Sequence, residues 1–449
     1  MIITETVFDN GLQLIYQPRT NPITSISLFC YVGSNNEPLK LHGKHNLNGI
    51  SHLIEHMMFK GTKHISDTTG IAKIFDSVGA YFNAYTDKNV TCYTVKTDSE
   101  HIIKSIHTLA DMVSYSTFKK TEFELEKKVV VEEIIRARDN TESYINNEIY
   151  SLVFQGNNLA NSIGGEPEHI LAYDYEQAKK YFETFYNPSN MVVSICSDVP
   201  LSTIKEIINS SYLITKPTTP INNTLYLDTT SLTAQTHIRS KAIDRKLEQT
   251  HIAIAFRTTD TYHEDIYALN ILQTILAGNM SSRLFKSLRL EHGLTYNVGI
   301  DASEYEKYGL FCILTSVDNK KLMDYNHDGV SKPGAISVIA ETLKELLDSG
   351  ITDSEVIKAK GYIKGHLTLN AENALNISDY NGKMILLNKP HIIPFHRLYE
   401  LKYSSVTKKS INSVIAKYFT LDRMSLYLIG PNASVTLKES VKILSSIKS

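Results

Sequence analysis

The sequence predicts a layered protein of strands and helices, of the α/β or α+β class, with two structurally similar halves. Strand-like apolar runs alternate with longer runs of helical periodicity, which is typical of layered folds. A polar stretch with two prolines, 216–224, divides the 449 residues almost in half. The order of predicted elements after this stretch repeats the order before it. We therefore expect a first half at 1–215, a linker at 216–235 and a second half at 236–449.

In the first half, strands are predicted where β-branched and aromatic residues gather, and helices where apolar residues recur every three to four positions. The predicted strands are 12–16, 23–31, 80–85, 90–96 and 191–196, and the predicted helices are 47–59, 69–78, 101–114, 122–137 and 173–186.

The second half repeats this order with little sequence identity. Its predicted elements are a strand at 251–256, helices at 266–276 and 283–290, Gly293, and strands at 296–300 and 308–314. Their counterparts are 26–31, 47–58, 71–78, Gly79, 80–85 and 90–96. A polar segment at 324–334 interrupts the second half, and we expect it to form a surface loop.

The composition excludes several classes of protein. Hydrophobic residues make up 42% of the chain and charged residues 21%, close to the globular average, which excludes global disorder. The formal net charge is −2, and we find no long run of lysine and arginine. The chain therefore has no overall electrostatic bias toward nucleic acid or an anionic membrane, and we expect neither as a partner.

The expected location is the cytoplasm. The N-terminus carries no signal-like or transit-like leader, and no apolar run reaches the roughly 18 residues that a transmembrane helix needs. The four cysteines, Cys30, Cys92, Cys196 and Cys312, each lie in a strand-like run and form no C-x-x-C pair. We expect buried free thiols, which suit a reducing compartment.

The segment 51–56 carries the strongest chemical signal. His52 and His56 are four residues apart, so on a helix they share one face and can offer two imidazoles to one metal ion. Glu55 flanks the same face. Two histidines and a carboxylate on one helix suit Zn²⁺, with the glutamate as the general base for a water molecule. The plainer reading is a surface helix with two solvated histidines and an acid.

A catalytic zinc ion needs a third protein ligand, which must come from elsewhere in the chain. The acidic helix predicted at 122–137 offers candidates. Glu126 and Glu133 are seven residues apart and share a face, whereas Glu132 points roughly 100° away from Glu133. Spacing alone does not choose between Glu133 and Glu132. For any one of these acids, a solvated helix face is the ordinary alternative.

The segment 49–62, GISHLIEHMMFKGT, resembles the inverted zinc signature of the pitrilysin and mitochondrial processing peptidase family. Other segments resemble the same family in the same order, and the resemblance extends from about residue 5 to residue 430. These segments are 83–86, 126–134, 162–165, 186–194 and 281–296. Their shared order makes the resemblance more specific than the H-x-x-E-H motif alone.

The resemblance implies one zinc ion per chain, with His52, His56 and Glu133 as ligands. The family leaves about 76 residues between the second histidine and the third ligand, and 76 residues lie between His56 and Glu133. The resemblance also implies that Glu55 is the general base. Glu126 would then orient a zinc-binding histidine from behind.

The resemblance assigns further roles outside the metal site. Arg289 and Tyr296, in the second half, would donate hydrogen bonds to the negative oxygen of the reacting peptide. Asn83 and Ala84 would lie on an exposed edge strand that pairs with an extended peptide. The plainer readings are two surface residues near a glycine turn and an ordinary strand residue.

For the whole molecule, the resemblance implies an α+β fold. Two α/β-sandwich halves, with mixed, mainly antiparallel sheets, would form a clamshell around a peptide-binding chamber. The helix at 266–276 is apolar, so the second half would close the chamber without binding metal. Family enzymes enclose substrate between four such domains, so we expect a homodimer or a heterodimer with a related chain.

The expected function is that of a zinc metalloendopeptidase acting on extended peptides or unfolded protein segments, for example a processing peptidase. The alternative is a non-catalytic structural or partner subunit that keeps the peptidase fold, and the complete H-x-x-E-H site argues against it. Two features depart from the family pattern. The loop before Gly49 is long and contains His42 and His45, which we interpret as solvated, and Asn279 stands where the family often has glycine.

Overall fold

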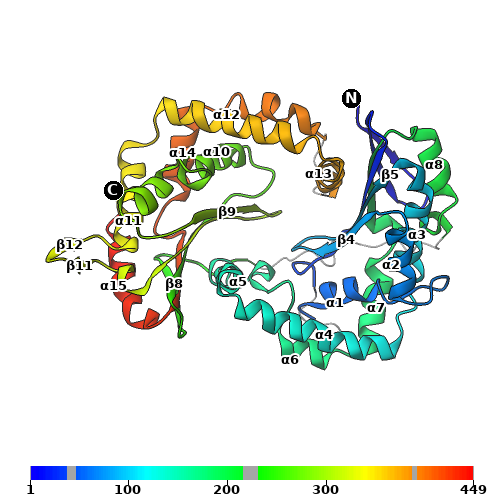
Figure 1. Cartoon of the computed structure of the whole chain (residues 1–449), viewed down its shortest axis with the longest axis horizontal. Helices are drawn as coiled ribbons and strands as arrows, with labels where there is room; N and C mark the ends of the chain where they lie inside the picture. Colours follow the sequence, from blue (N-terminus) through cyan, green and yellow to red (C-terminus); the bar gives the residue numbers. More distant parts are fainter. Residues whose placement is uncertain (1, 38–46, 216–230, 387–391, 448–449) are drawn as a thin grey trace. The chain divides into compact units, whose positions relative to one another are not determined.

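The computed structural model describes residues 2–37, 47–215, 231–386 and 392–447, which form two compact units (Figure 1). The first unit comprises Met1–Arg136, Asn161–Thr230 and Thr368–Arg397. The second unit comprises Ala137–Ala160, Ser231–Leu367 and Leu398–Ser449.

The first unit is built on a six-stranded sheet in the order β1-β2-β6-β3-β5-β4. Its strands are β1 (Thr4–Val7), β2 (Gln13–Pro18), β3 (Ile23–Cys30), β4 (Tyr81–Thr86), β5 (Thr91–Asp98) and β6 (Met191–Ser197). Neighbouring strands are antiparallel except β2 and β6, which are parallel.

The second unit has a five-stranded sheet in the order β7-β13-β8-β10-β9. Its strands are β7 (Arg239–Asp244), β8 (Gln249–Thr258), β9 (Val298–Glu304), β10 (Gly309–Asp318) and β13 (Met424–Gly430). Only β7 and β13 pair in parallel. Strand for strand, this is the order and direction of β2-β6-β3-β5-β4 in the first unit. The predicted α+β class and the similarity of the two halves are therefore confirmed.

Helices pack against both sheets. Those lying wholly or mostly in the first unit are α1 (Ile50–Met57), α2 (Thr68–Asp76), α3 (Ile102–Tyr115), α4 (Lys120–Asp139), α6 (Pro167–Ala172), α7 (Tyr175–Phe185), α8 (Leu201–Asn209), α9 (Tyr212–Thr215) and α13 (Ala374–Leu386). Those of the second unit are α5 (Thr141–Val153), α10 (Asp265–Ala277), α11 (Ala335–Ser349), α12 (Asp353–Asn370), α14 (Lys408–Tyr418) and α15 (Ala433–Ser445), with a π-helical turn at Phe285–Glu291.

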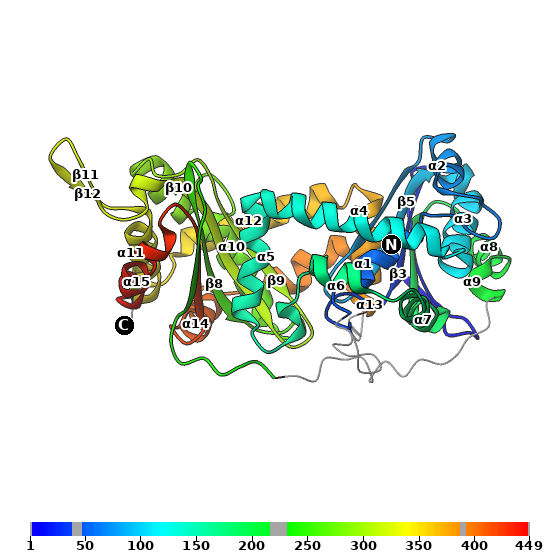
Figure 2. The ribbon, with the colours of Figure 1, turned by 90° about the horizontal axis from the view of Figure 1, so that it is seen from below.

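The units are not continuous in sequence, because each takes one helix from the opposite side of the predicted linker. Helix α5 packs against β8 and β13 of the second unit, and Figure 2 shows it alongside that sheet. Helix α13 packs against β3 and β6 of the first unit. Residues 216–230 of the predicted linker lie outside the described residues.

Helix α13 approaches the first sheet closely at Gly382. A Cβ atom at Gly382 would lie 2.2 Å from Cε2 of Phe29, a fully buried ring of β3. The serine hydroxyl of Ser378 lies 3.0 Å from that of Ser25 and 2.8 Å from that of Ser27. Because Gly382 has no side chain and Ser378 has a small one, α13 can pack close to the sheet.

Alanine substitutions at two helical glycines should have opposite effects. Gly382→Ala overpacks the contact with Phe29, so we expect the free energy of unfolding to fall by about 1–3 kcal/mol. Gly361, in α12, has no atom within 4 Å of an added Cβ. Gly361→Ala should raise the same quantity by up to about 1 kcal/mol, because alanine favours the helix. Chemical denaturation measures both, and a neutral or stabilising Gly382→Ala would contradict this packing.

The segment 324–334 differs from its prediction as a loop. It forms an exposed hairpin of β11 (Tyr325–His327) and β12 (Val330–Lys332). Asp328 and Gly329 have φ values of 52° and 77°, the left-handed conformation that a two-residue type I′ turn requires at both positions. An Asp-Gly pair is a recognised hairpin signal, and the polar composition of the segment obscured it.

Two other predictions concern the cysteines and the membrane. All four cysteines are buried free thiols, in β3, β5, β6 and β10, which confirms the prediction. Among the described residues, no helix is both long enough and apolar enough to cross a membrane.

Candidate metal centre

The residue just before helix α1 is at a position that only glycine can occupy. Gly49 has a φ of 95°, and a Cβ atom there would lie 2.5 Å from the carbonyl oxygen of Gly164. Leu53, Ile54 and Met57 are fully buried and fix the helix in the core. The opposite face of the helix, which carries the two histidines, is left partly open.

Helix α4 runs beside α1 and carries the acidic residues (Figure 1). Phe123, Val130 and Ile134 are buried and orient this helix against the core. Glu126 shares their face and is 3% exposed, whereas the side chain of Glu133, at the edge of that face, is 53% exposed.

Three ligand atoms from the two helices meet at one point. Nε2 of His52 lies 3.3 Å from Nε2 of His56. Oε2 of Glu133 lies 3.4 Å from Nε2 of His56 and 3.9 Å from Nε2 of His52. In the part of the chain that the structure describes, this is the only group of three or more histidine, cysteine or acidic side chains placed to hold a metal ion. Glu132 is not part of it.

The geometry of this group fits zinc. Tetrahedral zinc with bonds of about 2.0–2.1 Å places its ligand atoms roughly 3.3–3.4 Å apart. The observed separations of 3.3, 3.4 and 3.9 Å are close to that spacing. Three protein ligands would leave one coordination position for water or substrate. His42 and His45 lie outside the described residues.

The two histidines differ in their electrostatic environment. Burial lowers the pKa of His52 to about 4, and the neighbouring His56 adds to this, so His52 is neutral and able to bind metal at pH 7. Burial also lowers the pKa of His56, but hydrogen bonds with Glu126 and Glu133 outweigh burial and raise it to about 9. The carboxylates of Glu126 and Glu133 therefore stabilise positive charge on or beside His56, whether it is a proton or a metal ion.

Glu126 contacts the ring nitrogen of His56 that does not face the other two candidate ligands. Its Oε1 lies 3.0 Å from Nδ1 of His56, which leaves Nε2 facing His52 and Glu133. Its Oε2 lies 2.5 Å from Nζ of Lys60. Burial raises the pKa of Glu126, but hydrogen bonds from His56 and Lys60 bring it below its usual value. Glu126 is therefore an anion that can fix the histidine ring.

Glu55 lies beside the ligands on α1 and is 8% exposed. Its Oε2 accepts a hydrogen bond of 2.6 Å from Oγ1 of Thr86, at the end of β4. Burial raises the pKa of the Glu55 carboxyl, and the hydrogen bond from Thr86 opposes this rise. A carboxylate in this place can accept a proton from a water molecule at the metal position.

Asn83 and Ala84 lie on β4, at the edge of the first sheet, where β5 is the only strand that pairs with β4 among the described residues. Oδ1 of Asn83 accepts a hydrogen bond of 2.9 Å from the backbone N–H of Ala84, and Nδ2 donates one of 3.0 Å to the hydroxyl of Tyr81. The other edge of β4 has no strand partner within those residues.

Arg289 and Tyr296 lie in the second unit, whereas the metal group lies in the first. Nη1 of Arg289 donates a hydrogen bond of 2.8 Å to the carbonyl oxygen of Tyr296, and the guanidinium lies 4.4 Å from the centre of the tyrosine ring. Tyr296 is 79% exposed and lines a cavity of 640 Å³ with Asn297 and Asp301. The structure therefore brings these two residues together and leaves the tyrosine hydroxyl accessible.

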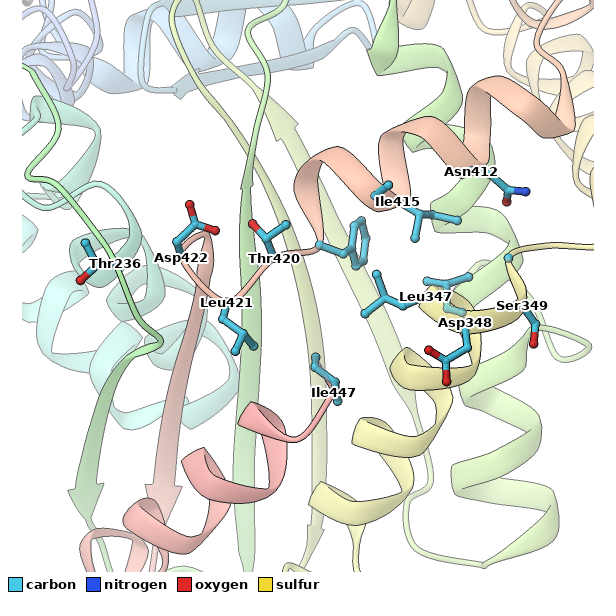
Figure 3. Close-up of a pocket in the computed structure, with 14 residues that line it drawn as sticks. Thr236, Leu347, Asp348, Ser349, Asn412, Ile415, Thr420, Leu421, Asp422 and Ile447 are labelled. Atoms are coloured by element: carbon cyan, nitrogen blue, oxygen red, sulfur yellow. The ribbon is translucent and has the colours of Figure 1, made fainter. Parts of the chain in front are cut away.

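A second cavity of 640 Å³ lies in the second unit and is lined by residues of α11 and α14 (Figure 3). None of the predicted site residues lines it. Ile415 and Leu347 form part of an apolar wall, the Oδ1 of Asn412 accepts a hydrogen bond from the backbone of Ile351, and Asp348 pairs with Lys344. We assign no chemistry to this cavity.

Three residues that were not predicted as site residues contact the site residues or the helix that carries them. Two are Thr86, which donates to Glu55, and Lys60, which pairs with Glu126. The third is Glu37, whose buried carboxylate accepts hydrogen bonds from the start of α1. Burial raises the pKa of Glu37 to about 7, although those hydrogen bonds oppose the rise. No short motif links Glu37 to α1, so the sequence offered no signal for it.

Comparison with known proteins gives family models for both halves. The model described as insulinase (peptidase family M16) matches residues 14–166, and the model described as peptidase M16 inactive domain matches residues 172–362. The chain is 30% identical to the uncharacterized zinc protease YmxG of Bacillus subtilis, over 95% of this chain and 98% of that protein. It is 28% identical to an uncharacterized zinc protease of Rickettsia felis, over 94% and 96% of the two chains.

Solved structures share the fold. A protease from Helicobacter pylori has a TM-score of 0.84 at 20% identity, covering 96% of this chain and 99% of that one. A peptidase M16 inactive domain from Pseudomonas fluorescens has a TM-score of 0.81 at 20% identity, covering 96% and 98%.

Proposed function

This chain belongs to the insulinase (M16) peptidase family, and we propose that it is a zinc-dependent endopeptidase acting on extended peptides or unfolded protein segments. The observation that carries the proposal is the meeting of Nε2 of His52, Nε2 of His56 and Oε2 of Glu133, with the carboxylate of Glu55 beside them. The relatives named as zinc proteases support the same metal.

When bound, zinc supplies Lewis acidity, which activates water and polarises a peptide carbonyl at neutral pH. Glu55 accepts a proton from the attacking water as the water oxygen bonds to the carbonyl carbon. It then delivers this proton to the amide nitrogen as the carbon–nitrogen bond breaks. Thr86 holds the Glu55 carboxylate by a hydrogen bond to one oxygen and leaves the other oxygen for proton transfer.

The edge strand β4 offers a way to bind substrates of many sequences. An extended peptide can pair with its open edge through backbone hydrogen bonds, which depend little on the side chains of the peptide. Asn83 and Ala84 lie on this strand, and Thr86 at its end contacts Glu55. A peptide paired with β4 would therefore run toward the residues that cleave it.

We propose Arg289 and Tyr296 as donors to the negative oxygen that forms during cleavage. Tyr296→Phe removes one hydroxyl donor, so kcat should fall by about 10²–10³ while zinc stays bound. Tyr262→Phe is the matched control, since Tyr262 is another exposed tyrosine of the second unit, at 46%. Steady-state cleavage of a quenched peptide measures both variants. Equal activity in the two variants would remove Tyr296 from the mechanism.

The oligomeric state and the compartment stay predictions. A homodimer, or a heterodimer with a related chain, would assemble four units of this kind from chains that each hold two. Light scattering of the purified protein distinguishes a monomer, which has the 50.6 kDa mass of one chain, from a homodimer of twice that mass. A cytoplasmic location is tested by fractionation of the source cells.

A further inference from the structure

Helix α1 begins without a cap of its own. The residue at its N-cap is Gly49, which has no side chain to accept a hydrogen bond, and the first turn contains no acidic residue. The first backbone N–H groups of a helix need such acceptors, and a helix of only eight residues gains little from its own cooperativity. His52 is the third residue of this helix. The position of His52, one of the three proposed ligands, therefore depends on the groups that stabilise the first turn.

Glu37, twelve residues before Gly49, supplies the missing acceptors. Its Oε2 accepts hydrogen bonds of 2.8 Å from the backbone N–H of Gly49 and 3.2 Å from Nδ2 of Asn48. Its Oε1 accepts one of 2.9 Å from the backbone N–H of Ser51. The residue is 2% exposed. A carboxylate in this place also complements the positive end of the helix dipole. We call these three hydrogen bonds the Glu37 clamp.

The surroundings of the Glu37 clamp hold it in place. Nδ2 of Asn48 also donates to the carbonyl oxygen of Ser162, at 2.8 Å, and the hydroxyl of Tyr173 donates to the carbonyl oxygen of Asn48. The hydroxyls of Ser51 and Tyr181 lie 3.0 Å apart. Residues that follow α5 in the chain therefore hold Asn48 and Ser51 in place.

We propose that Glu37 is a positioning residue for the metal centre, acting through the first turn of α1 to hold Nε2 of His52 against His56 and Glu133. This inference rests on the proposed function, because it presupposes that the three residues bind zinc. Without the clamp, the first turn loses two acceptors for its N–H groups and frays. His52 then leaves its place, while His56, one turn further along the helix and held by Glu126, keeps its own.

The test is a pair of variants that weaken equivalent helix caps. Glu37→Gln keeps the shape of the side chain but turns one acceptor oxygen into an NH₂ group that faces N–H donors. Asp174→Ala removes the cap of α7, where Oδ1 of Asp174 accepts hydrogen bonds of 2.9 Å and 3.2 Å from the backbone N–H groups of Glu176 and Gln177. Helix α7 carries no metal ligand, so this variant measures the loss of a cap alone.

We expect the zinc dissociation constant of Glu37→Gln, measured by chelator competition, to rise about 10–100-fold, as for outer partners of metal ligands. Asp174→Ala should bind zinc like the wild type, although both variants should lower the midpoint of thermal unfolding without metal. Cobalt(II) gives a second readout. Its visible absorption, strong in tetrahedral sites, should weaken in Glu37→Gln and not in Asp174→Ala.

The outcomes separate the two proposals. A wild-type protein that binds no zinc would overturn the proposed function. A wild type that binds zinc, with Glu37→Gln matching Asp174→Ala in zinc affinity and cobalt spectrum, would overturn only the role of Glu37. If Glu37→Gln does not fold, Asn48→Ser removes one donor of the clamp. It should weaken zinc binding by a smaller factor, and unchanged affinity in that variant would also reject the inference.

Discussion

Replacing Glu55 with glutamine is expected to slow peptide cleavage by orders of magnitude while zinc stays bound. The amide of glutamine keeps the size of the side chain and can still accept the hydrogen bond from Thr86, but it cannot take a proton from water. We expect kcat/KM to fall by about 10²–10⁴, the usual contribution of a positioned general base. Cleavage of a quenched extended peptide measures the loss, and mass spectrometry of the metal content measures the zinc.

The matched control for this experiment is Glu124→Gln. Glu124 is a half-exposed glutamate of α4 that pairs with Lys127 and does not contact the metal group. The Glu124→Gln variant should retain wild-type activity. Full activity in Glu55→Gln would reject Glu55 as the base. Loss of zinc from Glu55→Gln would show that this residue supports the site rather than the reaction.

Replacing Glu133 with glutamine is expected to weaken zinc binding strongly, because it neutralises one of the three proposed ligands. The dissociation constant should rise by more than the roughly 10–100-fold typical of losing an outer partner. Activity at limiting zinc should fall in parallel. Chelator competition measures the affinity of the purified variant.

The adjacent Glu132→Gln is the control for this second experiment, since it changes the same charge one position along α4. Glu132 is exposed and outside the metal group, so its variant should bind zinc like the wild type. Loss of zinc from Glu132→Gln alone would mean that the ligand has been assigned to the wrong residue.

The histidine pair could be predicted from sequence because its geometry is local. Residues four apart on one helix must share a face, whatever the rest of the chain does. The choice between Glu133 and Glu132 is different, since it depends on how α4 is rotated against α1. Helical spacing left both open, and only the resemblance favoured Glu133. The structure now places Glu133 with the histidines.

The contacts that support the site were beyond sequence reasoning for the same reason. Glu37 acts on backbone N–H groups twelve and fourteen residues away, and such groups carry no sequence signature. Thr86 reaches Glu55 from a strand, and Lys60 reaches Glu126 from the residues after α1. Each pairing requires the tertiary structure.

The fold, too, could be predicted only in part from the sequence. Repetition of the element order was enough to predict two similar units. It did not predict that α5 and α13 pack across the predicted linker, because the pattern of a helix shows that one face is buried but not which sheet covers it. Ser378 and Gly382 on α13 match Ser27 and Phe29 on β3, a relation that appears only once the two segments are in contact.

The most direct test of the account is anomalous X-ray diffraction at the zinc absorption edge, from crystals of the wild-type protein grown without added metal. We expect one zinc peak per chain, bonded to Nε2 of His52, Nε2 of His56 and Oε2 of Glu133. The absence of a zinc peak at this point, even in crystals soaked with zinc, or a peak bonded to other residues, would contradict this expectation.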